Sequence, residues 1–152
     1  MTDVRVALGD RSYDVRIETG LIDRAGAEIA PLLNRPRVAI VTEEHVAALH
    51  LDRLREALAA EGIDSEALVL PRGEGTKNWE NLTRTVEWLL SEKIERKDVV
   101  VAFGGGVIGD LAGFAAAILR RGVRFVQIPT SLLAQVDSSV GGKTGINSPH
   151  GK

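Results

Sequence analysis

Apolar residues along this chain fall into two kinds of block that follow one another in regular order. Short runs rich in β-branched residues, at 37–41, 65–70, 98–103 and 123–128, predict buried strands. Longer runs with apolar positions three or four residues apart, at 21–33, 44–60, 76–93 and 107–119, predict helices. Strands that alternate with helices predict an α/β fold, a Rossmann-like open and mostly parallel sheet with helices on both faces.

The two ends of the chain depart from this alternation. Segments 4–8 and 13–18 alternate apolar and polar residues around a Gly-Asp-Arg-Ser turn, which predicts an N-terminal β-hairpin. Thr76 is predicted to cap the helix that begins with it. A short helix at 131–136 is followed by a run rich in Ser, Gly and Lys. This run is too particular for a disordered tail, and no element closes it, so we expect the chain to be a fragment of a longer protein.

Composition narrows the class of protein. The 152 residues are enough for one domain, and 44% hydrophobic with 26% charged residues is ordinary for a globular chain. A net charge of -2 gives no sign of a nucleic-acid or membrane surface. The absence of cysteine excludes disulfides and thiolate metal sites. Together with a mixed polar and apolar start, these features favour a cytoplasmic protein.

The most informative stretch is FGGGVIGD at 103–110, which satisfies G-x-G-x-x-G between a predicted strand and helix. Glycine would let the backbone approach a phosphate, and the helix N-terminus would offer free N–H groups. The stretch is not the first strand-to-helix turn, however, and no ribose-binding acid follows about twenty residues on. A glycine turn with only a packing role is therefore the alternative. Asp110 would either cap the first turn of the helix or accept a hydrogen bond from a ribose or substrate hydroxyl.

Other polar segments offer weaker signals. RGEGTKN at 72–78 follows a predicted strand, where ligands bind in open parallel sheets, so Glu74 could meet a ribose and Lys77 a phosphate. The alternative is a solvated loop. The GGKTG run lacks the first glycine of a phosphate-binding P-loop, because Asp137 stands there, and no strand precedes it. His45 and His50 lack the spacing of two zinc ligands on one helical face, so no metal site is predicted in this segment.

Taken together, GEGTK, GGGVIGD, RRGVRFVQIPTSLLAQVDSSVGGKTGIN and the closing HGK resemble the 3-dehydroquinate synthase family. The resemblance implies an N-terminal NAD-binding α/β domain, residues 1–152, joined in family members to a C-terminal helical metal-binding domain. It implies that the tail, residues 137–152, belongs to the active-site cleft between the two. Members convert 3-deoxy-D-arabino-heptulosonate 7-phosphate to 3-dehydroquinate and phosphate in the shikimate pathway. They use NAD and a divalent metal, Zn or Co, whose glutamate and two histidine ligands would lie outside this chain.

The resemblance also implies roles for individual residues. The substrate and catalytic positions would be Asp137, Lys143, Lys152 and Arg121, the last reaching the substrate phosphate of a partner subunit in a homodimer. Glu43 would take the place of an acid that some relatives use on the adenine ribose. The implied cofactor contacts are Arg72, Gly73, Glu74, Gly75, Thr76, Lys77, Gly105, Gly106, Val107, Ile108, Gly109, Asp110, Thr130, Ser131, Lys143 and Lys152.

Two alternatives stay open at the level of sequence. One is a sister sugar-phosphate cyclase of the 2-deoxy-scyllo-inosose or 2-epi-5-epi-valiolone synthase type. The other is a nucleotide-binding module without catalysis. In each enzyme case the expected partner is a small sugar phosphate, with no nucleic acid and no membrane, and the isolated chain is expected not to turn over substrate.

Overall fold

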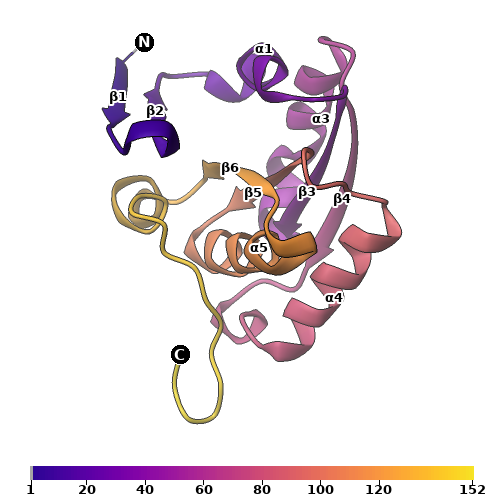
Figure 1. The fold of residues 1–152 in the computed structure, drawn as a ribbon, viewed down its shortest axis with the longest axis vertical. Helices are drawn as coiled ribbons and strands as arrows, with labels where there is room; N and C mark the ends of the chain where they lie inside the picture. The colour runs from indigo at the N-terminus through magenta and orange to yellow at the C-terminus, as the bar shows by residue number, and fades with distance from the viewer. Residues whose placement is uncertain (1) are drawn as a thin grey trace.

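A computed structural model describes residues 2–152, which form a parallel sheet between two helical layers and a separate hairpin (Figure 1). The hairpin pairs β1 (Thr2–Val6) with β2 (Tyr13–Ile17) in antiparallel register, as predicted. The main sheet has the order β4-β3-β5-β6, and every neighbouring pair is parallel. Its strands are β3 (Arg37–Glu43), β4 (Asp64–Leu70), β5 (Val99–Gly104) and β6 (Arg124–Pro129). The predicted fold class is therefore confirmed.

Helices cover both faces of this sheet because the central strands are apolar on both sides. Alternate residues of β3 and β5 pack on α4 and α5 in one core, and the residues between them pack on α1 and α3 in the other. Figure 1 shows the sheet lying between these two pairs. The helices are α1 (Ala25–Ile29), α2 (Glu44–Val46), α3 (Asp52–Ala59), α4 (Trp79–Ser91) and α5 (Gly106–Ile118). None of the helices in residues 2–152 has the length and apolarity that a membrane crossing needs.

The structure corrects several predicted helix boundaries. The segment predicted as one helix at 21–33 is α1 flanked by 3₁₀ turns at Leu21–Arg24 and Ala30–Leu32. In the segment at 44–60, a π-helical turn, Ala47–Leu51, separates α2 from α3. After β6 the helical turn is centred further along than predicted, at Ala134–Ser138.

The prediction that Thr76 caps α4 is wrong. Asn78 is the N-cap, and its side-chain oxygen accepts a hydrogen bond from the Asn81 N–H at 2.9 Å. The Thr76 hydroxyl instead donates to the Pro71 carbonyl at 2.5 Å. Thr76 thereby closes the loop between β4 and α4, and the helix starts three residues later because Asn78 is the better cap.

A buried charge fixes the start of β5 at the amino edge of the sheet. Asp98 is 2% exposed and accepts two hydrogen bonds from Arg35, at 2.9 and 2.6 Å, and one from the Glu95 N–H. Burial raises the pKa of this carboxyl, but the hydrogen bonds from Arg35 and Glu95 outweigh burial, and the pKa lies below its ordinary value of 3.8. The carboxylate therefore stabilises the fold in its charged form.

We predict that Asp98→Asn lowers the free energy of unfolding at pH 7 by about 1–2 kcal/mol, since a partly solvated arginine loses its charged partner. A lowered folded-state pKa stabilises above the ordinary pKa and is lost as the pH falls through the folded-state value. Urea unfolding followed by circular dichroism should thus show the two chains converging below pH 4. Asp64→Asn, an exposed acid at the start of β4, is the matched control. A difference that stays constant from pH 7 to pH 2 would contradict this role for Asp98.

Candidate functional site

The segments that the sequence singled out lie after the carboxyl ends of the parallel strands. Residues 72–78 follow β4, the glycine stretch follows β5, and Thr130 and Ser131 follow β6. Because parallel strands end at one edge, these segments lie at the edge where open α/β sheets bind ligands. Thr130 is tied to this edge by its N–H, which donates to the Gly104 carbonyl at 3.0 Å.

The glycine stretch forms an uncapped helix N-terminus. Gly105 is the N-cap of α5 and has no side chain to satisfy the first N–H groups, which belong to Gly106, Val107 and Ile108. A Cβ on Gly105 would lie 3.3 Å from Ser131 Oγ, and a Cβ on Gly106 would lie 3.1 Å from Ser138 Oγ. The two glycines therefore leave room in a narrow space lined by two hydroxyls. Such a terminus, with its partial positive charge, suits an anion.

The neighbouring glycines serve packing. A Cβ on Gly104 would lie 2.9 Å from the Ile108 side chain, which is fully buried, and one on Gly109 would lie 3.2 Å from Gln127 Oε1. The packing role predicted as the alternative thus applies to Gly104 and Gly109.

Lys77 is buried between two carboxylates. Its ammonium lies 2.9 Å from Asp110 Oδ2 on α5 and 3.0 Å from Glu74 Oε1 in its own loop, and its side chain is 5% exposed. A lone ammonium at this depth would be strongly unfavourable, so the pairing is what permits its burial. The arrangement links the loop after β4 to the helix after β5.

The hydrogen bonds of this cluster favour the charged forms of Lys77 and Glu74. Burial lowers the pKa of Lys77, but hydrogen bonds to Asp110 and then Glu74 outweigh burial, so the pKa is raised above its ordinary value. The pKa of Glu74 is lowered, first by the hydrogen bond from Asn147 and then by that from Lys77. Lys77 is therefore a fixed cation at neutral pH and not a general base.

Asp110 does not cap α5, contrary to one of the two predicted roles. The helix begins at Gly106, so Asp110 lies beyond its first turn, and its carboxylate pairs with Lys77. The Glu43 carboxylate accepts hydrogen bonds from the His45 and Val46 N–H groups and caps α2.

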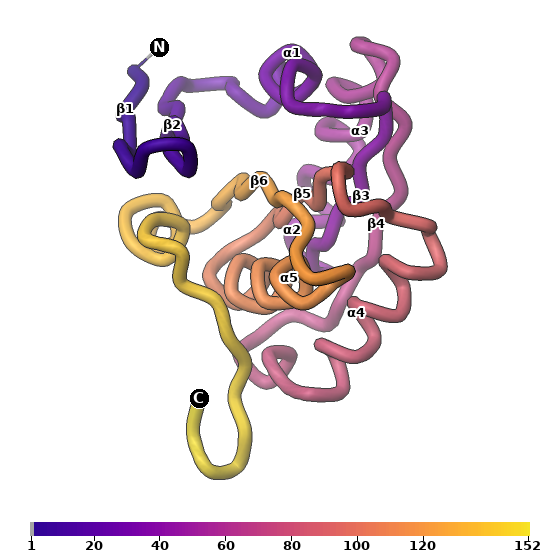
Figure 2. Tube along the Cα trace, viewed as in Figure 1, coloured from indigo at the N-terminus to yellow at the C-terminus, as the bar shows by residue number. Residues whose placement is uncertain are grey.

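The tail is ordered against these two elements. The Gly145 N–H donates to the Asp110 carbonyl at 3.2 Å, and the Asn147 N–H donates to the Lys77 carbonyl at 2.9 Å. Ile146 between them is 7% exposed and belongs to the core beneath α4 and α5. Figure 2 shows this yellow segment running beside the start of α5 and past the loop before α4. The expectation that the tail has defined structure is confirmed.

The remaining predicted site residues have fewer contacts with the Lys77 cluster. Asp137 and Lys143 pair with each other at 2.5 Å on the exposed part of the tail. Lys152 is exposed and lies near enough to lower the pKa of Glu74 by its charge. Arg72 is exposed in the loop after β4. Arg121 follows α5 and precedes β6, which puts it at the amino edge of the sheet, away from the cluster.

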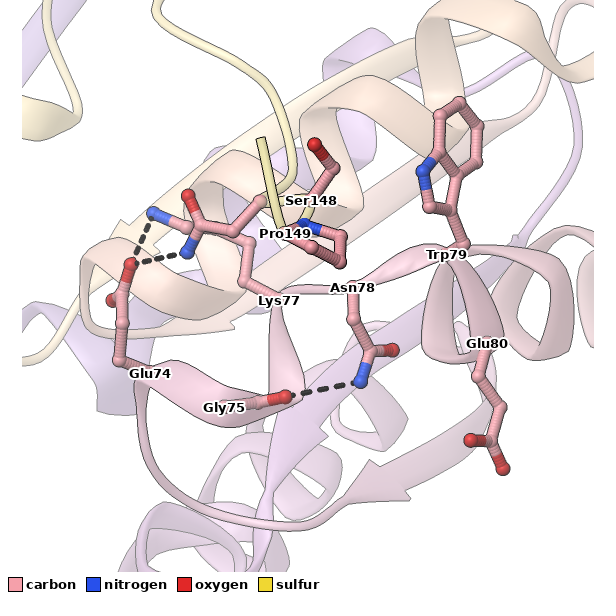
Figure 3. A pocket seen from close by; sticks show the side chains of 9 residues that line it. Glu74, Gly75, Lys77, Asn78, Trp79, Glu80, Ser148 and Pro149 are labelled. Atoms are coloured by element: carbon pink, nitrogen blue, oxygen red, sulfur yellow. Dashed lines mark hydrogen bonds and ion pairs between the residues drawn. The ribbon is translucent and has the colours of Figure 1, made fainter. Parts of the chain in front are cut away.

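A shallow depression borders the Lys77 cluster. It is formed by the loop after β4, the first residues of α4 and the tail, and Figure 3 shows Glu74, Lys77, Trp79 and Pro149 around it. Gly105 and Gly106 do not line it. The described residues thus offer two features, the uncapped N-terminus of α5 and a depression beyond Lys77.

Two residues that contact these features were not singled out from the sequence. Asn147 donates to Glu74 Oε1 at 2.9 Å, and Ser138 faces Gly106. Both lie inside the long motif that resembles the family, but nothing local marks an Asn or Ser in a glycine-rich run as a contact. Only the folded tail brings them to the site.

Within the described residues, the structure supports neither a P-loop for a nucleotide triphosphate nor a metal site. The GGKTG run follows a π-helical turn and not a strand, so it lacks the setting of a P-loop. Among residues 2–152, no group of three or more His, Asp or Glu side chains is placed to hold a metal ion.

Comparison with known proteins agrees with the fold and the motifs. The family model described as "3-dehydroquinate synthase N-terminal" matches residues 67–152. A 3-dehydroquinate synthase of Ruegeria pomeroyi is 73% identical over 152 residues, which is 100% of this chain and 41% of that protein. The chain thus spans about two fifths of the length of this relative.

Solved structures of two related cyclases share the fold. A 2-deoxy-scyllo-inosose synthase complexed with carbaglucose-6-phosphate, NAD⁺ and Co²⁺ superposes with a TM-score of 0.89 at 24% identity, covering 99% of this chain and 41% of that one. A 2-epi-5-epi-valiolone synthase from Streptomyces hygroscopicus, with NAD⁺ and Zn²⁺ bound, gives a TM-score of 0.81 at 32% identity, covering 94% and 39%. From the family match and the identity along its whole length, this chain belongs to the 3-dehydroquinate synthase family.

Proposed function

We propose that this chain is the NAD-binding part of a 3-dehydroquinate synthase. The enzyme would convert 3-deoxy-D-arabino-heptulosonate 7-phosphate to 3-dehydroquinate and phosphate in the shikimate pathway. The observation that carries the proposal is 73% identity over all 152 residues to a relative of that name. The two solved sister cyclases are 24% and 32% identical, so they support the fold and the cofactor more than their own reactions.

The residues at the carboxyl edge of the sheet fit a dinucleotide. The pyrophosphate would lie at the N-terminus of α5, where Gly105 and Gly106 present no Cβ and three N–H groups have no capping side chain. Ser131 and Ser138 would face the same phosphates through their hydroxyls. Glu74 would accept a hydrogen bond from a ribose hydroxyl, with Lys77 and Asp110 holding the local charge balance.

The proposed roles of the cofactor and of the side chains follow from this placement. Bound NAD⁺ would supply a hydride acceptor for transient oxidation of a ring hydroxyl of the substrate. The chain's own residues would orient the reactants: Lys143 and Lys152 would neutralise the anionic groups of the sugar phosphate, and Asp137 would accept a hydrogen bond from a hydroxyl. We further propose that residues 137–152 line the active-site cleft, and that Arg121 serves the substrate phosphate of a partner subunit in a homodimer.

Metal chemistry is proposed to come from other residues. The family resemblance implies a divalent ion held by a glutamate and two histidines, and the residues described here contain no such cluster. We therefore propose that the ligands lie outside this segment. We also propose that the whole enzyme works in the cytoplasm. A role as a binding module without catalysis would keep the same cofactor site.

Substitution at the helix N-terminus tests the cofactor site. We predict that Gly106→Asp abolishes binding of NAD⁺, because the new carboxylate would meet Ser138 and repel the pyrophosphate. Isothermal titration should show at least about a 100-fold loss, which corresponds to about 3 kcal/mol. Asn34→Asp, which adds the same charge before β3 at the far edge of the sheet, should bind as the unsubstituted chain does. Retained binding in Gly106→Asp would place the dinucleotide elsewhere.

Lys77 gives a second test that separates binding from folding. We predict that Lys77→Met costs about 1–3 kcal/mol of unfolding free energy, since Asp110 would lose its charged partner, and weakens NAD⁺ binding at least about 10-fold. The double variant Lys77→Met with Asp110→Asn should recover stability in urea but not affinity. Recovery of both would mean that Lys77 serves folding alone.

A further inference from the structure

The position of Asn147 is set by contacts other than its own side chain. Its N–H donates to the Lys77 carbonyl, and Gly145 two residues earlier donates to the Asp110 carbonyl. Ile146 is buried in the core between these two bonds. The backbone of Asn147 is therefore held against the loop after β4 whatever side chain stands there.

The side chain of Asn147 makes one directed contact. Nδ2 donates to Glu74 Oε1 at 2.9 Å, the oxygen that also accepts from Lys77 Nζ at 3.0 Å (Figure 3 draws both bonds as dashed lines). Both bonds thus fall on the same carboxylate oxygen. Within residues 2–152 no bond engages Oε2, so this oxygen is left as an acceptor for a ligand.

Glu74 has few other restraints. Its side chain is 61% exposed, and its neighbours are Gly73, with φ of +102°, and Gly75, around which no atom crowds. Lys77 alone would hold it weakly, because the same ammonium is shared with Asp110. A glutamate with several freely rotating bonds on a glycine-flanked loop needs a second anchor if its carboxylate is to keep one orientation.

We propose that Asn147 is a positioning residue that fixes the Glu74 carboxylate beside Lys77, so that its second oxygen faces the cofactor ribose. The inference rests on the proposed function, because it takes the ligand of Glu74 to be NAD⁺. The charged groups near Glu74 are Lys77, Lys152 and, across Lys77, Asp110. The hydrogen bond from Asn147 contributes most to the lowered pKa of Glu74, which agrees with a bond to the charged carboxylate.

In a purely structural role, Asn147 would only anchor the tail to the loop after β4. The two roles differ in what the substitution changes. A positioning residue acts on NAD⁺ binding through Glu74, so this effect disappears when the carboxylate is removed. An anchor for the tail would act through the same bond, and its loss would lower stability.

The test is a double-mutant cycle on NAD⁺ binding. Asn147→Ala should weaken binding about 5- to 10-fold, the scale of one hydrogen bond, with an unchanged melting temperature. In the Glu74→Ala background, adding Asn147→Ala should have no further effect. Asn34→Ala, at an exposed asparagine before β3, is the matched control. Effects of Asn147→Ala that are equal in both backgrounds, or no effect in either, would overturn the proposal.

A second measurement does not depend on the cofactor. Carbon NMR titration of the Glu74 carboxyl should give a higher pKa in Asn147→Ala than in the unsubstituted chain, and a higher one still in Asn147→Asp, which adds a second carboxylate. An unchanged pKa would refute the positioning role. If the unsubstituted chain binds no NAD⁺, the proposed function fails, while the titration still decides whether Asn147 holds Glu74.

Discussion

The buried ammonium of Lys77 is the contact on which the arrangement of this site depends. It joins the loop after β4 to the helix after β5, two elements that are not neighbours along the sheet because β3 lies between their strands. An ammonium that is 5% exposed is tolerated only with charged partners in good geometry. Asp110 and Glu74 supply them, so both carboxylates lie beside the one cation.

The ordered tail follows from the same constraint. Once Lys77 holds the loop against α5, the Lys77 and Asp110 carbonyls stand at either side of a path that the tail can bridge with main-chain bonds. Gly113 keeps this path open, because a Cβ there would lie 2.7 Å from Thr144 Cγ2. The side chain of Ile146 then closes the core. A glycine-rich run is thus fixed by a buried isoleucine, two carbonyls and one close approach, and not by regular secondary structure.

Sequence pattern predicted the sheet well because its strands are buried on both faces and their apolar runs are unambiguous. It erred where local chemistry chooses between neighbouring residues. Thr76 and Asn78 are both good caps, and only the bond from Thr76 to Pro71 in the folded loop shows which one is used. The sequence leaves two roles open for Asp110, because it cannot show that a lysine more than thirty residues away is its partner. Asn147 carried no signal, since its contact exists only after the tail folds back.

The two ends of the candidate site differ in how firmly they are built. Lys77 is buried among partners, whereas Lys143 and Asp137 are 53% and 57% exposed and pair only with each other. An exposed pair of this kind contributes about 0–1 kcal/mol, because water competes for both charges. Lys143 can therefore leave Asp137 for an anionic ligand at little cost, while Lys77 cannot leave Asp110. On the proposed function, the site would thus keep its shape where the cofactor is bound and adapt where the substrate arrives and departs.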